Sequence, residues 1–143
     1  MKKIYVFIML LSSLLSADEN VKKLVLDLTT SDIAKFEKGI LKAIVFNTNY
    51  YESSFKELKT SVIIHGGAYK FFIKDTKSIS KGLQTRIKSL QDNYDVEFLI
   101  CGAGMKSRDI KQDNIYSFVK ITPNAMIGLI NKQNDGYAYV PVK

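Results

Sequence analysis

Cys101 is the residue of this chain best suited to nucleophilic chemistry, and it is the only cysteine among 143 residues. It ends an apolar run and precedes Gly102 and Gly104, which leave backbone amides accessible. Amides at the start of a helical turn stabilise a thiolate, and the cations Lys106 and Arg108 would add to that effect. A thiolate is the form that attacks sulfur and other electrophiles. The alternative interpretation is a small, buried, structural side chain at a strand end.

His65 is the only histidine, and it precedes two glycines at the end of another apolar run. If both runs are parallel strands, His65 and Cys101 reach the same edge of the sheet, where the imidazole would be a base or proton partner for the thiol. The competing interpretation is a ring that hydrogen-bonds a loop carbonyl, because nothing in the sequence fixes the distance between the two side chains. A third polar cluster, residues 27–31, follows the first apolar run, but no carboxylate is assigned to the pair.

Motifs for other chemistries are absent from the sequence. One cysteine and one histidine cannot form a standard zinc site, so no metal site is expected. The glycines after Cys101 lack the complete G-x-G-x-x-G pattern, and no Walker, G-x-S-x-G or H-E-x-x-H motif occurs, so no cofactor is expected. Tyr137 and Tyr139 near the end of the chain are interpreted as core or interface packing.

The elements that must position these residues alternate between strand-like and helix-like stretches. Short apolar runs predict strands at residues 24–28, 62–64, 96–100, 116–121 and 137–142. Helical spacing predicts helices at 33–44 (closed by 47–53), at 68–73, after an N-cap at Ser78, at 105–110 and from Pro123. This order indicates an α/β three-layer sandwich with a mostly parallel five-stranded sheet. Ligands of such sheets bind beyond the carboxyl ends of the strands.

The first 17 residues have the pattern of a secretory signal peptide. A cationic start precedes 12 mostly apolar residues, 4–15, and small residues follow. The apolar run is shorter than the roughly 20 residues that a membrane-spanning helix needs, so no stable membrane insertion is expected after cleavage. The expected location is the periplasm, and the expected folded domain covers residues 22–142.

The charge of the chain is mildly basic, with a net charge of +7 at pH 7. The lysines are scattered over predicted helix faces and loops, and aromatic residues do not interleave with them, so no nucleic-acid partner is expected. A single cysteine excludes an internal disulfide, and a lone thiol in an oxidising compartment is prone to oxidation. Such a thiol persists when it is buried or when it has a function.

Three segments carry short motifs in a characteristic order. They read SVIIHGGAYKFF around His65, EFLICGAGMKSRDI around Cys101 and NAMIGLINKQNDGYAYV near the end of the chain. From about residue 22 to 142 the chain resembles the DsrE/DsrF-like sulfur-relay family, in particular an exported, single-domain branch. The resemblance implies a flavodoxin-like fold, often assembled as homo- or hetero-oligomers. It also implies a persulfide on a cysteine that Cys101 matches, with Arg108 matching a basic residue in the following turn.

The leading hypothesis is a periplasmic sulfur-carrier or persulfide-handling protein, in which Cys101 is the nucleophile and His65 an accessory group. The two glycines and two cations after Cys101 would bind and stabilise the sulfur, which must be presented to solvent. Its partners would be sulfur donor and acceptor proteins or small inorganic sulfur species, in a homo-oligomer. The alternative is a non-catalytic oligomeric module that binds a small ligand or a partner, with a structural cysteine. Sulfurtransferase-like turnover is left open, because a carrier need not be a catalyst.

Overall fold

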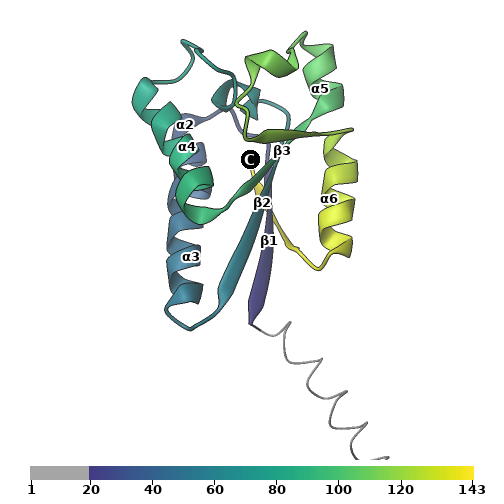
Figure 1. Cartoon of the computed structure of the whole chain (residues 1–143). Helices are drawn as coiled ribbons and strands as arrows, with labels where there is room; N and C mark the ends of the chain where they lie inside the picture. The colour runs from purple at the N-terminus through teal and green to yellow at the C-terminus, as the bar shows by residue number, and fades with distance from the viewer. Residues whose placement is uncertain (1–19) are drawn as a thin grey trace, which may run out of the picture.

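A five-stranded sheet, in which every pairing is parallel, organises the fold (Figure 1). The computed structural model describes residues 20–143. The strands are β1 (Val21–Leu28), β2 (Glu57–Ile64), β3 (Glu97–Cys101), β4 (Val119–Thr122) and β5 (Ala138–Val142). They lie in the order β4-β3-β2-β1-β5. The predicted α/β class is confirmed. All strands are parallel, whereas a mostly parallel sheet was predicted. The strand order differs from the order 2-1-3-4-5 of flavodoxin.

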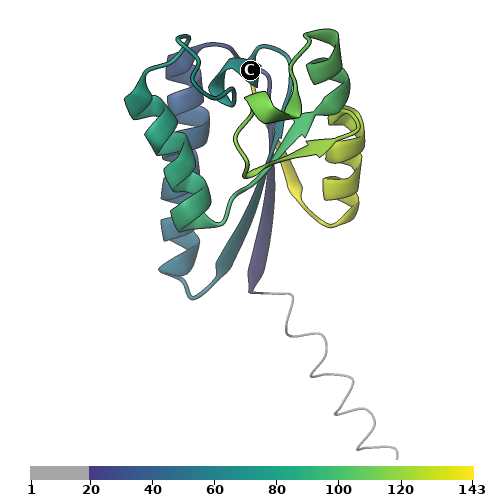
Figure 2. The same ribbon diagram turned by 45° about the horizontal axis from the view of Figure 1, so that its top comes forward.

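Helices cover both faces of the sheet and so complete the three layers. One layer holds a continuous helical segment, α2 (Ile33–Phe36), the π-helix η1 (Glu37–Lys42) and α3 (Ala43–Glu52), with α4 (Lys81–Tyr94) packed beside it. The helices α5 (Gly102–Ser107) and α6 (Ala125–Asn134) lie on the other side of the sheet (Figure 1). The 3-10 helices are η2 (Ala68–Phe71) and η3 (Gln112–Asn114). Figure 2 shows the short segments that follow the strands gathered at one end of the sheet.

The strand order explains why α6 lies apart from α3 and α4. The first four strands are laid side by side in sequence order, and the chain then crosses back through α6 to place β5 beside β1. Crossovers between parallel strands keep one hand, so a reversal of direction moves the connecting helix to the opposite face. The helix α6 consequently contacts β1, β2, β3 and β4.

The core lies mainly between the sheet and the layer that contains α4. Four phenylalanines form a contiguous cluster there, with ring centroids 4.0 Å apart for Phe36 and Phe71 and 5.3 Å apart for Phe72 and Phe98. All four side chains are fully buried. Because each buried aromatic side chain removes a large apolar area from water, this cluster fixes η2 against β3.

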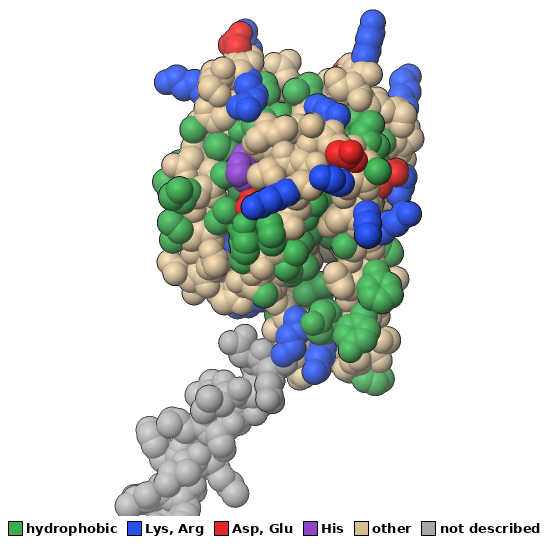
Figure 3. All heavy atoms as spheres, turned by 180° about the vertical axis from the view of Figure 1, so that it is seen from behind, with side chains coloured by type: hydrophobic (Ala, Val, Ile, Leu, Met, Phe, Trp, Pro, Cys, Tyr) green, Lys and Arg blue, Asp and Glu red, His purple; other side chains and the backbone are tan. Residues whose placement is uncertain are grey.

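The opposite face keeps several large hydrophobic side chains exposed (Figure 3). On α6 these are Met126, 71% exposed, together with Ile127 and Ile130. On the edge strand β5, Tyr139 faces the same side. This group of four residues is called the α6–β5 patch below.

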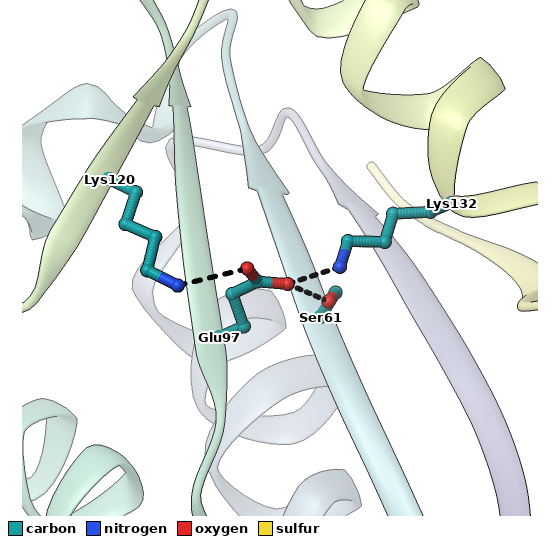
Figure 4. Close-up of polar contacts among 4 residues, drawn as sticks. All are labelled: Ser61, Glu97, Lys120 and Lys132. Atoms are coloured by element: carbon teal, nitrogen blue, oxygen red, sulfur yellow. Dashed lines mark hydrogen bonds and ion pairs between the residues drawn. The ribbon is translucent and has the colours of Figure 1, made fainter. Parts of the chain in front are cut away.

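Glu97 on β3 holds α6 against its face of the sheet (Figure 4). Its Oε2 accepts hydrogen bonds from Ser61 Oγ at 2.8 Å and from the ammonium of Lys132 on α6, and its Oε1 accepts one from Lys120 at 3.3 Å. Burial raises the pKa of the Glu97 carboxyl, but the hydrogen bonds from Lys132 and Ser61 lower it more, so the pKa lies below its usual value. The ionised carboxylate therefore stabilises the folded chain.

We predict that Glu97→Gln lowers the free energy of unfolding at pH 7 by about 1–3 kcal/mol, because it leaves the mostly buried ammonium of Lys132 without its counter-charge. A carboxyl whose folded-state pKa is depressed stabilises fully above its unfolded-state pKa, about 4.3, and the effect is lost as the pH falls through the folded-state pKa. Urea unfolding at pH 7 and at successively lower pH should show the difference from wild type shrinking.

The control is Glu57→Gln, because Glu57 and Lys59 are 3.9 Å apart and both largely exposed. An exposed pair of this kind contributes little, so this variant should unfold like wild type. A Glu97→Gln difference that stays constant down to strongly acidic pH would contradict the account.

Several predicted boundaries were wrong. The helix ends at Glu52, within the stretch 47–53 that was predicted to close it, but β2 begins at Glu57 rather than at residue 62. The helix predicted after Ser78 is capped instead by Ser80, whose Oγ accepts the N–H of Leu83 at 3.2 Å. The turn predicted at 105–110 begins directly after Cys101. The fourth strand begins at 119 rather than 116.

The predicted signal peptide, residues 1–17, lies outside the residues that the structure describes. Within residues 20–143, no helix is both long and apolar enough to cross a bilayer.

Candidate functional site

Cys101 stands where β3 ends and α5 begins, as the N-cap of the helix. Its Sγ accepts a hydrogen bond from the N–H of Gly104 at 3.4 Å. Only 7% of the residue is exposed, a point that the sequence left open. The residue is buried, and the groups around its sulfur include polar hydrogen atoms as well as aliphatic groups.

Backbone amides from two helices act on this sulfur. Burial raises the pKa of the Cys101 thiol, but the hydrogen bond from the Gly104 amide, and the nearby Tyr69 hydroxyl and amides of Ala125 and Ala103, lower it more. The pKa therefore lies below its ordinary value. Ala125 is the first residue of α6, so the N-termini of α5 and α6 meet at one atom. The partial positive charge of helix N-termini favours a thiolate there.

Tyr69 is a member of the site that the sequence did not indicate. Its buried hydroxyl donates to the carbonyl oxygen of Cys101 at 2.9 Å. The guanidinium of Arg108 lies over its ring, 4.7 Å from the centroid, and donates to the carbonyls of Gly66 and Gly104, both at 3.2 Å. Burial, and then the hydrogen bond and charge of Cys101, raise the pKa of Tyr69. The hydroxyl therefore stays a hydrogen-bond donor.

The glycines after Cys101 are required by close approaches. A Cβ at Gly104 would lie 1.8 Å from the hydroxyl oxygen of Tyr69. A Cβ at Gly102 would lie 2.9 Å from Cγ2 of Ile121 and 3.1 Å from the carbonyl oxygen of Thr122. The Gly104 amide has the predicted contact with the sulfur, whereas Gly102 contributes space for β4.

The two predicted cations lie near the site without acting directly on the sulfur. Arg108 joins the loop after β2 to α5 through its carbonyl contacts and covers the ring of Tyr69. Lys106 is exposed, and the groups that lower the pKa of the thiol are amides and a hydroxyl rather than its ammonium. Peptide dipoles therefore replace the cations in the expected role.

His65 follows the end of β2, beside Cys101 at the end of β3, but its hydrogen bond goes elsewhere. Its Nε2 lies 2.6 Å from Oδ1 of Asp27 on β1, and the hydroxyl of Tyr139 on β5 donates to Oδ2 of Asp27 at 2.7 Å. Within residues 20–143, no hydrogen bond joins His65 to Cys101. The carboxylate that the sequence did not assign is thus Asp27, from the predicted cluster at 27–31. Tyr139, interpreted as packing, is part of the same group.

A hollow of about 670 Å³ lies far from Cys101. It is lined by the first residues of β1, the end of α6 and Tyr51 on α3, at the opposite end of the sheet. Over the same part of the chain, no group of three or more His, Cys, Asp or Glu side chains is placed to hold a metal ion.

Comparison with protein families identifies the chain. A family model described as the DsrE/DsrF-like family matches residues 23–142. This chain belongs to the DsrE/DsrF-like family.

One curated protein and two solved structures are similar to this chain. A protein of Aquifex aeolicus (strain VF5), described as uncharacterized, is 30% identical over 93 residues, which cover 60% of this chain and 41% of that protein. The chain thus spans less than half of that relative's length. The protein of unknown function MTH1491 from Methanobacterium thermoautotrophicum has a TM-score of 0.66 at 14% identity, and the ychN protein from E. coli one of 0.57 at 12%. Each covers 84% of this chain and 98% of the other, and both show the shared fold alone.

We predict that Gly104→Ala raises the pKa of the Cys101 thiol, because the new Cβ displaces the Tyr69 hydroxyl and moves the Gly104 amide. The pH dependence of alkylation at Cys101 should have its midpoint below about 8.5 in wild type and higher in the variant. Tyr69→Phe removes one of the same donors and should shift the midpoint in the same direction.

Gly82→Ala is the matched control, since its Cβ would meet nothing nearer than Ser80 Oγ at 3.9 Å. It should leave the midpoint unchanged. Identical midpoints for wild type, Gly104→Ala and Tyr69→Phe would show that these donors do not set the thiol pKa.

Proposed function

We propose that this DsrE/DsrF-like protein is a periplasmic sulfur carrier that holds sulfane sulfur as a persulfide on Cys101. The observation that carries the proposal is the Gly104 amide, which donates to Sγ at 3.4 Å, together with the Tyr69 hydroxyl and the α6 N-terminus close by, which also lower the pKa of the thiol. These donors favour the thiolate, which is the nucleophile in sulfur exchange. Family membership supplies the chemical context.

The transfer step follows ordinary thiol chemistry. The Cys101 thiolate attacks the outer sulfur of a donor R–S–SH, a new S–S bond forms on Sγ, and the old S–S bond breaks to release R–S⁻. The outer sulfur then lies about 2 Å beyond Sγ, the length of one S–S bond. Because Cys101 is largely buried, this outer atom is the one that reaches an acceptor. The same amides stabilise negative charge on the persulfide.

The periplasmic part of the proposal is supported by the signal-like pattern of residues 1–17. The α6–β5 patch supports a homo-oligomer, because contiguous exposed apolar side chains of this kind mark protein interfaces. Partners would be persulfide-bearing proteins or small sulfane-sulfur species.

A second function is favoured by one observation, the 7% exposure of Cys101. In that alternative the thiol is structural, and the α6–β5 patch makes the chain a non-catalytic interaction module. The two functions differ in whether the sulfur reacts while the chain is folded.

We predict that the folded protein, incubated with polysulfide and weighed intact, gains ~32 Da, the mass of one sulfur atom added by thiolate attack. Cys101→Ser is the matched control because it removes the only thiol, and it should gain nothing. Addition of a low-molecular-weight thiol acceptor should then return wild type to its original mass. Wild type that gains mass only after denaturation would favour the structural cysteine and overturn the carrier.

A further inference from the structure

Four polar side chains meet at the carboxyl ends of four neighbouring strands: Tyr139 of β5, Asp27 of β1, His65 after β2 and Cys101 of β3. Strand register places them on one face. Ser61 and Glu97 are paired across β2 and β3 and hydrogen-bond to each other, and side chains alternate along a strand, so His65 and Cys101 extend the same rows.

The distance between the Cα atoms of His65 and Cys101 follows from the same strand register. Ile64 pairs with Ile100, so the next residues on each strand, His65 and Cys101, are neighbours about 5 Å apart at Cα. An incoming group bound at Cys101 therefore lies beside the imidazole.

The imidazole of His65 is held by a buried group while one edge stays open. The Asp27 side chain is 10% exposed and the His65 side chain 29% exposed. A carboxylate can only accept hydrogen bonds, so an ionised Asp27 requires a proton on Nε2 of His65. Within residues 20–143, no hydrogen bond occupies the Nδ1 atom. The histidine is visible at the surface in Figure 3, coloured purple.

Tyr139 completes the arrangement by fixing the carboxylate. It donates to Oδ2 of Asp27 while Nε2 of His65 binds Oδ1, so the two oxygens have separate partners and the carboxylate plane cannot rotate freely. The hydrogen bond to Asp27 raises the pKa of the Tyr139 hydroxyl, which keeps it a donor. The imidazole is consequently oriented through two hydrogen bonds from two further strands.

Because neighbouring amides lower the pKa of the Cys101 thiol, the imidazole is assigned to a different proton step. We infer that Nδ1 of His65 is the general acid for the thiol that leaves when Cys101 takes sulfur, with Asp27 and Tyr139 as positioning residues, and that the donors are alkyl persulfides. This inference rests on the proposed carrier function and assigns the proton step within it.

In the proposed step, each bond that forms is matched by a bond that breaks, and the proton has a defined donor and acceptor. The Cys101 thiolate attacks the outer sulfur of R–S–SH, the Sγ–S bond forms, the donor S–S bond breaks, and R–S⁻ takes the Nδ1 proton of the imidazolium to leave as R–SH. Cys101 becomes Cys–S–SH and the imidazole becomes neutral, still donating from Nε2 to Asp27. Delivery to an acceptor thiol runs in reverse, with Nδ1 taking the proton of the incoming thiol.

The donor class follows from leaving-group basicity. Alkyl thiols have pKa values near 8.5, so their thiolates leave slowly without protonation, whereas less basic aromatic thiolates leave readily. A positioned general acid contributes about 10²–10⁴-fold, and only where the leaving group needs the proton.

The test compares two reagents on the full chain. One is glutathione persulfide, followed by intact mass, and the other is an aromatic disulfide that releases thionitrobenzoate on attack by Cys101. His65→Gln should slow the alkyl reaction by about 10²-fold and leave the aromatic reaction unchanged. Asp27→Asn and Tyr139→Phe should reduce the alkyl rate to smaller degrees with the same leaving-group selectivity, while Tyr137→Phe should match wild type.

Rescue of a second variant, His65→Ala, by free imidazole provides an independent measurement. Free imidazole should restore the alkyl reaction of His65→Ala and leave its aromatic reaction unaltered. Equal losses with both reagents, or no loss with either, overturn the general-acid role. Wild type that takes no sulfur from glutathione persulfide overturns the carrier function itself, which separates the two failures.

Discussion

The convergence of backbone amides on the Cys101 sulfur is the interaction on which the rest of the site depends. Burial by itself raises the pKa of this thiol, and only the donors from α5, α6 and Tyr69 reverse the direction. The two helices can meet there because Gly102 leaves room for the backbone of Thr122, and because the Ala103 amide donates to the Pro123 carbonyl at 3.0 Å. A shift of either helix would leave a desolvated thiol with little nucleophilic character.

The rest of the fold maintains that meeting point. Glu97 connects the last turn of α6 to β2, β3 and β4, and so helps to fix this helix against the sheet. The crossover that moves α6 to its face also sets β5 beside β1, which brings Tyr139 to Asp27. One topological feature thus supplies an amide for the thiol and a donor for the carboxylate. Thiolate formation and proton transfer are consequently carried by separate groups on adjacent strands.

The sequence pattern around Cys101 predicted those parts of the site that are formed by residues close together in the chain. The apolar run before Cys101 and the glycines after it indicated a strand end and a helix start, and both are present. Ser80, rather than Ser78, caps α4. The prediction chose the wrong residue because two serines two residues apart satisfy the same capping pattern. The pairing of Asp27 with Tyr139 could not be predicted, because it needs β5 beside β1, a neighbour relation 112 residues apart that no periodicity encodes. Tyr69 was missed for the same reason.

The measurement that tests the central claim most directly is titration of the Cys101 thiolate by its ultraviolet absorbance, taken as the difference between wild type and Cys101→Ser. The titration is run on the folded chain and repeated in denaturant, which removes the helix N-termini and leaves the thiol intact. The account predicts a folded-state midpoint clearly below the denatured midpoint near 8.5. A folded-state midpoint equal to or above the denatured one would show that burial outweighs the amides, and would contradict the account.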